Sequence, residues 1–281
     1  MSGTKIYEYH RPTTVNEALA LLAPPAAERQ PPTIPLAGGT AVDRTSAEAV
    51  AVVDLQALGL DGLLPGGASL EVGAMLTLQS LLEYLDAANE TEMGGLDALK
   101  RVIPLEATYN LRQVATVAGT LVAAGGRSPF ATALLALDAR LSLLPGDETT
   151  ALGDLLPFRH ERLHGRLITQ VSLPLNARLA YEYVARTPAD QPVVAAAAAI
   201  WPSGRTRIAL GGFDPKQSDK RNDKRSGAPC LAFDGTEADG ATLAARNAYA
   251  QAGDEWASAD YRQEMAGILT QRCLDSLYTQ N

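Results

Sequence analysis

Cysteine is scarce in this chain of 281 residues, which contains only Cys230 and Cys273. An iron–sulfur cluster normally takes four cysteine thiolates at close spacing, so the chain cannot hold such a cluster by itself. So few cysteines fit a reducing compartment better than a secreted protein built on disulfides, although a bond between the two stays open. We expect two unpaired structural thiols.

Long apolar runs and an excess of positive charge are also missing. No segment approaches the roughly 18 apolar residues that a membrane-spanning helix needs, and residues 1–11 lack the apolar core of a signal peptide. Lysine and arginine number 24 against 32 acidic residues, a formal charge of −8. This balance argues against a nucleic-acid binder, which needs a basic patch, and against a polybasic membrane-binding segment. We therefore expect a cytoplasmic protein.

Familiar catalytic constellations are absent from the sequence as well. No serine lies in a G-x-S-x-G elbow, and no cysteine neighbours a histidine. The string from His160 to His164 (HERLH) matches H-E-x-x-H, in which two histidines on one helical face bind zinc. Pro157 and Gly165 leave room for a short helix only, and no third ligand follows at a convincing spacing. We therefore favour a polar surface turn over a zinc hydrolase.

Apolar residues, 46% of the chain, alternate between strand and helix spacing over about the first 175 positions. Strands are expected at 34–37, 49–55, 70–74, 112–117, 140–144 and 167–173, and helices at 14–22, 78–85, 93–103 and 130–137. Thr14 and Glu17 have the spacing of a capping box at the start of the first helix. The third helix is expected to stop before Pro104. This alternation indicates an α/β arrangement.

After about position 175, the spacing of apolar residues predicts a group of strands followed by helices. Strands are expected at 181–186, 193–201 and 206–210, and amphipathic helices at 237–250 and 261–278. The strands predict a small antiparallel sheet. Residues 216–226 carry five basic side chains, and we interpret them as a solvated surface loop in preference to a partner-binding segment. A domain boundary is expected near residues 174–178.

Two glycine-containing turns are candidate phosphate-binding elements. The first glycine turn, residues 37–40 (AGGT), follows the expected strand at 34–37, and the second glycine turn, residues 116–120 (TVAGT), follows the one at 112–117. Glycine lets backbone N–H groups approach an anion closely, and successive N–H groups form a nest for phosphate oxygens. Neither turn matches the standard dinucleotide or P-loop fingerprints, and each alone is a weak signal. Together they predict that the backbone amides of the two turns bind a diphosphate from its two sides.

The order of these features resembles the FAD-binding medium subunit of the xanthine dehydrogenase and carbon monoxide dehydrogenase family, the molybdenum hydroxylases. The matching runs are YHRPT at 9–13, AGGT at 37–40, VDL at 53–55, LEVGA at 70–74, ATVAG at 115–119, ALLALDA at 133–139, YEYVAR at 181–186, IALGG at 208–212 and SADYR at 258–262. No single run is decisive, but so many in order are specific. The resemblance implies an α+β fold.

Within that fold, the resemblance implies a PCMH-type FAD-binding domain at 1–175, with α/β subdomains at about 1–57 and 58–175. A C-terminal domain of antiparallel sheet plus helices would follow at 176–281. The residues implied to bind FAD are Ala37, Gly38, Gly39, Thr40 and Ala41 on one side, Thr116, Ala118, Gly119 and Thr120 on the other, and Ser128 and Arg186 nearby.

The implied partners are a small subunit with [2Fe–2S] clusters and a large subunit with a molybdopterin cofactor. In this family, substrate is oxidised at molybdenum, and electrons pass through the clusters to FAD and on to an external acceptor. The scarcity of cysteine agrees with this division of labour, because the clusters must then belong to another chain.

Departures from the family pattern affect the cofactor site. The second glycine turn reads TVAGT where the family usually has TIGGN, so Ala118 replaces a glycine and Thr120 an asparagine. A side chain at position 118 costs ~1 kcal/mol or more if a positive φ is needed there. Pro129 replaces an aspartate that contacts the cofactor, and Gln191 replaces an aromatic or aliphatic residue near the isoalloxazine ring. The alternative reading is therefore a flavin-poor homologue that acts as a structural subunit. Because backbone amides do most of the phosphate binding, we favour FAD.

Overall fold

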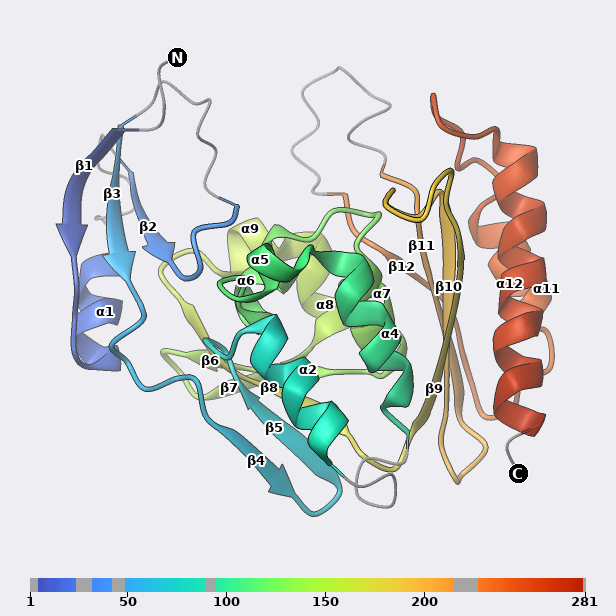
Figure 1. Cartoon of the computed structure of the whole chain (residues 1–281), viewed down its shortest axis with the longest axis horizontal. Coiled ribbons are helices and arrows are strands. Elements are labelled where there is room, and N and C mark those ends of the chain that lie inside the picture. Colours follow the sequence, from blue (N-terminus) through green and yellow to red (C-terminus); the bar gives the residue numbers. More distant parts are fainter. Residues whose placement is uncertain (1–4, 24–31, 42–48, 89–94, 215–226, 280–281) are drawn as a thin grey trace.

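The computed structural model describes residues 5–23, 32–41, 49–88, 95–214 and 227–279, and this part of the chain forms three sheets with helices between and beside them (Figure 1). The strands are β1 (Lys5–His10), β2 (Thr33–Leu36), β3 (Ala49–Asp54), β4 (Leu63–Gly66), β5 (Ser69–Gly73), β6 (Arg140–Leu144), β7 (Glu148–Ala151), β8 (Leu167–Pro174), β9 (Arg178–Val184), β10 (Val194–Ile200), β11 (Thr206–Gly211) and β12 (Cys230–Gly235). The helices are α1 (Val15–Leu22), α2 (Leu78–Ala87), α4 (Asp97–Glu106), α5 (Tyr109–Arg112), α6 (Val117–Ala123), α7 (Pro129–Ala136), α8 (Leu152–Leu155), η2 (Leu156–Phe158), α9 (Arg159–Arg162), α11 (Ala241–Ala248) and α12 (Ala259–Thr279).

The first sheet is parallel, with the strand order β1-β3-β2, and α1 packs beside it. The capping box is confirmed: the Thr14 hydroxyl accepts from the Glu17 amide at 3.2 Å, and the Glu17 carboxylate accepts from the Thr14 amide at 3.3 Å. The buried face of α1 presents Ala18 and Leu22 to a small core that includes Leu55. The strand β2 ends at Leu36, and the first glycine turn follows it directly.

The second sheet is antiparallel, with the order β4-β5-β8-β6-β7. It provides the expected strands at 70–74, 140–144 and 167–173, whereas β4 and β7, like β1 and β12, escaped prediction. The helices α2, α4, α6 and α7 share a large core with β5, β6 and β8. This core holds α6, and with it the second glycine turn, against the sheet.

The expected strand at 112–117 is wrong. Residues 109–112 form α5, and α6 begins at Val117. Thr116 makes one isolated bridge to Thr77, but its side chain accepts from the Gly119 amide at 3.1 Å and caps a helix. Helix capping therefore prevails over strand pairing, and the second glycine turn is the first turn of a helix.

The predicted end of the helix before Pro104 is also wrong, because α4 continues to Glu106. Its predicted start extends beyond the described residues. Pro104 is exposed and lies in the last turn, so it removes a single intrahelical hydrogen bond. The fully buried neighbours Val102 and Ile103 anchor this part of the helix in the core. Packing therefore outweighs the local cost of proline.

The third sheet is antiparallel, with the order β12-β11-β10-β9, and it lies between two layers of helices (Figure 1). The helices α4 and α7 cover one face, and α11 and α12 cover the other. Every residue of β10 is buried because alternate alanines face opposite sides: Ala195 and Ala197 join the core around α7, and Ala196 and Ala198 join the core around α12. The predicted small antiparallel sheet followed by two helices is confirmed.

One large core contains buried residues from Leu70 to Ala209 and so includes residues on both sides of position 175.

The expected basic loop at 216–226 lies outside the described residues. No helix in the described part of the chain is long and apolar enough to cross a membrane.

Candidate functional site

The two glycine turns lie in direct contact. A β-carbon placed on Gly38 would lie 1.7 Å from the carbonyl oxygen of Val114, just ahead of the second turn. A β-carbon on Gly119 would lie 3.6 Å from the β-carbon of Ala37. Position 38 therefore accepts only glycine without movement of the backbone, and segments some eighty positions apart in the sequence pack against each other.

The first glycine turn presents backbone amides that have no protein acceptor within the described structure. Gly39 has a φ of +68°, which glycine adopts without strain. The amides of Gly38, Gly39 and Thr40 donate no hydrogen bond to any described residue. Gly38 and Gly39 are half-buried, where an amide normally finds an acceptor, and Thr40 is exposed. These groups are therefore suited to a ligand that brings its own oxygens.

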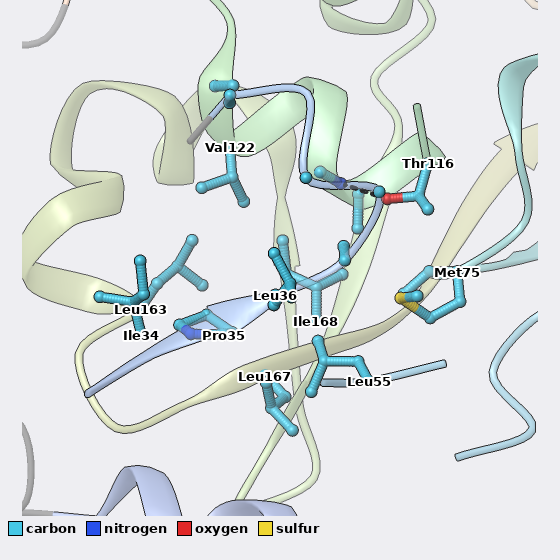
Figure 2. Close-up of a pocket in the computed structure, with 18 of the residues that line it drawn as sticks. Ile34, Pro35, Leu36, Leu55, Met75, Thr116, Val122, Leu163, Leu167 and Ile168 are labelled. Carbon is cyan, nitrogen blue, oxygen red and sulfur yellow. Dashed lines mark hydrogen bonds between the residues drawn. The ribbon is translucent and has the colours of Figure 1, made fainter. Parts of the chain in front are cut away.

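The second glycine turn has its amides committed within the protein. The four amides from Val117 to Thr120 donate, in order, to the carbonyls of Leu76 and Ala74 and to the side chain and carbonyl of Thr116, at 2.8–3.1 Å. The bond to the Thr116 hydroxyl is the dashed line in Figure 2. These four amides have acceptors, whereas the amides of Gly38, Gly39 and Thr40 in the first turn have none in the described part of the chain.

Ala118 lies at the second position of α6 and carries no backbone strain. The non-glycine residues with a positive φ in the described chain are Asp138 and Asp147. The expectation that a side chain at position 118 forbids a needed conformation therefore does not apply, because a helical residue has a negative φ.

Beside both turns lies a cavity of about 390 Å³, which we call the apolar cavity. Its wall includes the predicted site residues Ala37, Gly38, Gly39, Thr40, Ala41, Thr116, Ala118 and Gly119. Figure 2 shows Val122 pointing from α6 toward Leu36 and Ile168. Arg166 is the one charged residue among the described residues of the wall, and it forms an ion pair with Glu148 at 2.8 Å. Such a wall suits a planar ring and keeps water away from it.

A second cavity of about 320 Å³, the polar cavity, adjoins the first. The two share Thr40, Ala41 and Ala123 in their walls, so the end of the first glycine turn stands between them. The predicted residues Thr120 and Ser128 line the polar cavity, as does Gln191. A dinucleotide consists of two ring systems joined by a charged diphosphate. Open amides between two adjoining cavities therefore fit a dinucleotide such as FAD.

The hydroxyl of Ser128 is engaged within the protein. It accepts from the Ala131 amide at 3.1 Å as the cap of α7, and it donates to Glu106 at 2.8 Å. The same Glu106 oxygen accepts from the Phe130 amide at 2.9 Å. Pro129 is the first residue of α7, a position that favours proline. Glu106, which the sequence did not mark as a site residue, therefore holds the start of α7 beside Pro129.

Burial raises the pKa of Glu106, and the hydrogen bonds from Phe130 and Ser128 oppose that shift. Sequence reasoning missed this residue because the helix that carries it was expected to end before Pro104. If the predicted helix is extended past Pro104, Glu106 falls within it. In the structure this helix places the Glu106 carboxyl group in the wall of the polar cavity.

Arg186 lies outside the walls of both cavities. Its guanidinium stacks over the Trp256 ring at 5.5 Å from the centroid, and Arg127 stacks over the same ring at 4.8 Å. Arg127 does line the polar cavity, and it donates to the carbonyls of Gln191 at 2.6 Å and Pro192 at 2.9 Å. Among the described residues, Trp256 is the link between Arg186 and the wall of the polar cavity, and contact of Arg186 with the cofactor stays a prediction.

The HERLH string forms no long helix, since α9 spans only Arg159–Arg162. Within the described residues, no group of three or more histidine, cysteine or acidic side chains is placed to hold a metal ion. The geometry therefore gives no support to a zinc hydrolase.

Comparison with known proteins adds an independent finding. A family model described as the FAD-binding domain in molybdopterin dehydrogenase matches residues 5–176. The uncharacterized protein YgfM of Escherichia coli (strain K12) is 29% identical over 216 residues, which cover 75% of this chain and 76% of that protein.

Solved structures share the fold over nearly the whole chain. Reconstituted CO dehydrogenase from Oligotropha carboxidovorans matches with a TM-score of 0.76 and 24% identity, covering 97% of both chains. Quinoline 2-oxidoreductase from Pseudomonas putida 86 matches with a TM-score of 0.70 and 20% identity, covering 98% of both chains.

Proposed function

Because the chain belongs to the family of FAD-binding domains in molybdopterin dehydrogenases, we propose that it is the electron-transfer flavoprotein subunit of a molybdenum hydroxylase. FAD is the cofactor of this family domain. A partner subunit with [2Fe–2S] clusters delivers the electrons, and an external acceptor removes them. A large subunit with a molybdopterin cofactor oxidises the substrate.

The observation that carries this proposal is the contact between the glycine turns. The amides of Gly38, Gly39 and Thr40, which find no acceptor among the described residues, lie in the wall of the apolar cavity, and Thr40 also borders the polar cavity. When bound, FAD supplies the capacity to exchange electrons with a donor and an acceptor. The protein's own part is to hold the diphosphate at these amides and to orient the rings.

The proposed site residues in the two cavity walls have tasks that follow from their positions. Residues 37–41 form the floor for the diphosphate, and the Thr40 hydroxyl adds a donor. Thr116, Ala118 and Gly119 support these residues from the neighbouring turn, where Gly119 lies beside Ala37. Thr120 and Ser128 belong to the wall of the polar cavity. The apolar cavity excludes water from whichever ring enters it.

The proposed domains are a FAD-binding domain at 1–175, with subdomains at about 1–57 and 58–175, and a C-terminal domain at 176–281. The third sheet and its outer helices α11 and α12 belong to the second of these domains. On this proposal, the scarcity of cysteine reflects the placement of all clusters in a partner chain.

Purification of the tagged chain from its native host tests the proposal. We expect a yellow protein that releases one FAD per chain on mild denaturation, and co-purifying iron and molybdenum in two further polypeptides. A colourless chain that still brings down both partners would establish the structural-subunit alternative. Absence of both flavin and partners would overturn the proposal.

A further inference from the structure

Arg159 is a buried cation whose partners are backbone carbonyls. Its side chain is 4% exposed, and its guanidinium donates to the carbonyls of Val122 at 2.9 Å, Leu156 at 2.9 Å, Ala124 at 2.5 Å and Gly227 at 3.1 Å. Burial lowers the pKa of Arg159, and the nearby charge of Asp214 opposes that shift. An arginine that satisfies four carbonyls in this way acts as a connector between backbone segments.

Two of these carbonyls lie at the carboxyl end of α6, the helix that begins with the second glycine turn. The last carbonyls of a helix have no partner within the helix, so a guanidinium placed there fixes its end. Val122 lines the apolar cavity and Ala124 lines the polar cavity. The other end of α6 lies beside the first glycine turn, because a β-carbon on Gly119 would lie 3.6 Å from that of Ala37. The helix thus links Arg159 mechanically to the diphosphate floor.

The other two carbonyls that accept from Arg159 belong to segments outside α6, so Arg159 connects α6 to those segments. Leu156 belongs to η2, immediately before α9, and Gly227 precedes β12 in the third sheet. A lysine cannot replace this arrangement, because its ammonium is a point donor without the planar fork that reaches several acceptors at once. The position therefore requires arginine specifically.

From these contacts we propose that Arg159 is a positioning residue for the flavin site, which sets the placement of α6 and through it the first glycine turn. The inference rests on the proposed flavin site. It assigns a role in cofactor affinity to a side chain that lines neither cavity.

Substitution Arg159→Lys tests the proposal, with Arg162→Met as the matched control. Arg162 lies on the same helix α9 but donates to Thr150, Asp154 and Glu148, away from α6. The measurement is the FAD dissociation constant of each folded apoprotein, together with the visible circular dichroism of bound flavin. We expect Arg159→Lys to weaken FAD binding at least about tenfold and to alter the flavin dichroism. The control should leave both unchanged.

A merely structural role predicts a different outcome. In that case Arg159→Lys would lower the melting temperature while the FAD dissociation constant stayed within about twofold of the wild type, and the proposal would be overturned. If the wild-type chain itself bound no FAD, the flavin site would fail first, so the two failures are distinguishable.

A measurement on the unaltered protein keeps the proposal testable if the variant does not fold. FAD binding should slow amide hydrogen exchange at residues 122–126 and also at Arg159 and Gly227, which line neither cavity. Protection confined to the cavity walls would contradict the proposed link.

Discussion

Gly38 lies so close to the carbonyl oxygen of Val114 that a β-carbon at position 38 would be 1.7 Å from that oxygen. Gly38→Ala should therefore force the two glycine turns apart, and overpacking of this kind costs about 1–3 kcal/mol. We expect FAD binding to weaken at least about tenfold, since each tenfold corresponds to about 1.4 kcal/mol. Titration of the apoprotein with FAD, followed by flavin fluorescence, measures the effect.

Gly62→Ala is the control for this prediction, because a β-carbon at Gly62 meets no atom within 4 Å. It should leave the FAD dissociation constant unchanged. Equal FAD dissociation constants for Gly38→Ala and the wild type would show that the close packing at Gly38 is not needed for FAD binding.

Ala118→Gly restores the residue that the family usually has, but the structure predicts no gain in flavin binding. Ala118 is helical and its amide already donates to the Ala74 carbonyl at 3.1 Å. Glycine in a helix costs about 0.5–1 kcal/mol relative to alanine. Urea unfolding should show that loss, with the FAD dissociation constant within about twofold of the wild type. A clearly tighter complex would mean that the bound state needs a positive φ at this position.

Glu106 should make the stability of the protein depend on pH. Burial raises its pKa above the ordinary value of 4.5, so the folded protein holds this proton more tightly than the unfolded chain does. The resulting stability is fully present below the unfolded pKa, and it is lost as the pH rises from about 4.5 through the raised folded value.

Glu106→Gln isolates this effect. Glutamine stays neutral and keeps an oxygen that can accept from Ser128 and from the Phe130 amide. The free energy of unfolding, measured in urea across this pH range, should fall more steeply with rising pH in the wild type than in the variant. Identical pH profiles would remove Glu106 as the cause.

Local signals in the sequence sufficed for much of the fold. The capping box at Thr14 and the alternating alanines of β10 act through neighbours in the chain, so their consequences could be predicted. The strand that leads into the first glycine turn was predicted for the same reason. The second turn was misassigned because the Thr116 side chain, which favours a helix cap, competes with a strand pattern of similar length.

The parts of the site that escaped prediction depend on contacts between distant segments. Glu106 reaches Ser128 only because α4 continues through Pro104, and Arg159 donates to the carbonyl of Gly227, 68 positions further along the chain. Neither contact leaves a periodic or spaced pattern in the sequence. The two glycine turns also differ in whether their backbone amides have acceptors within the protein. This difference depends on the folded structure and could not be predicted from the sequence.

A crystal structure of the FAD-loaded protein tests the central claim most directly. It should show diphosphate oxygens within hydrogen-bond distance, about 2.7–3.2 Å, of the amides of Gly38, Gly39 and Thr40, with a ring system in each adjoining cavity. A diphosphate bound away from the first glycine turn, or FAD bound elsewhere on the chain, would contradict the account.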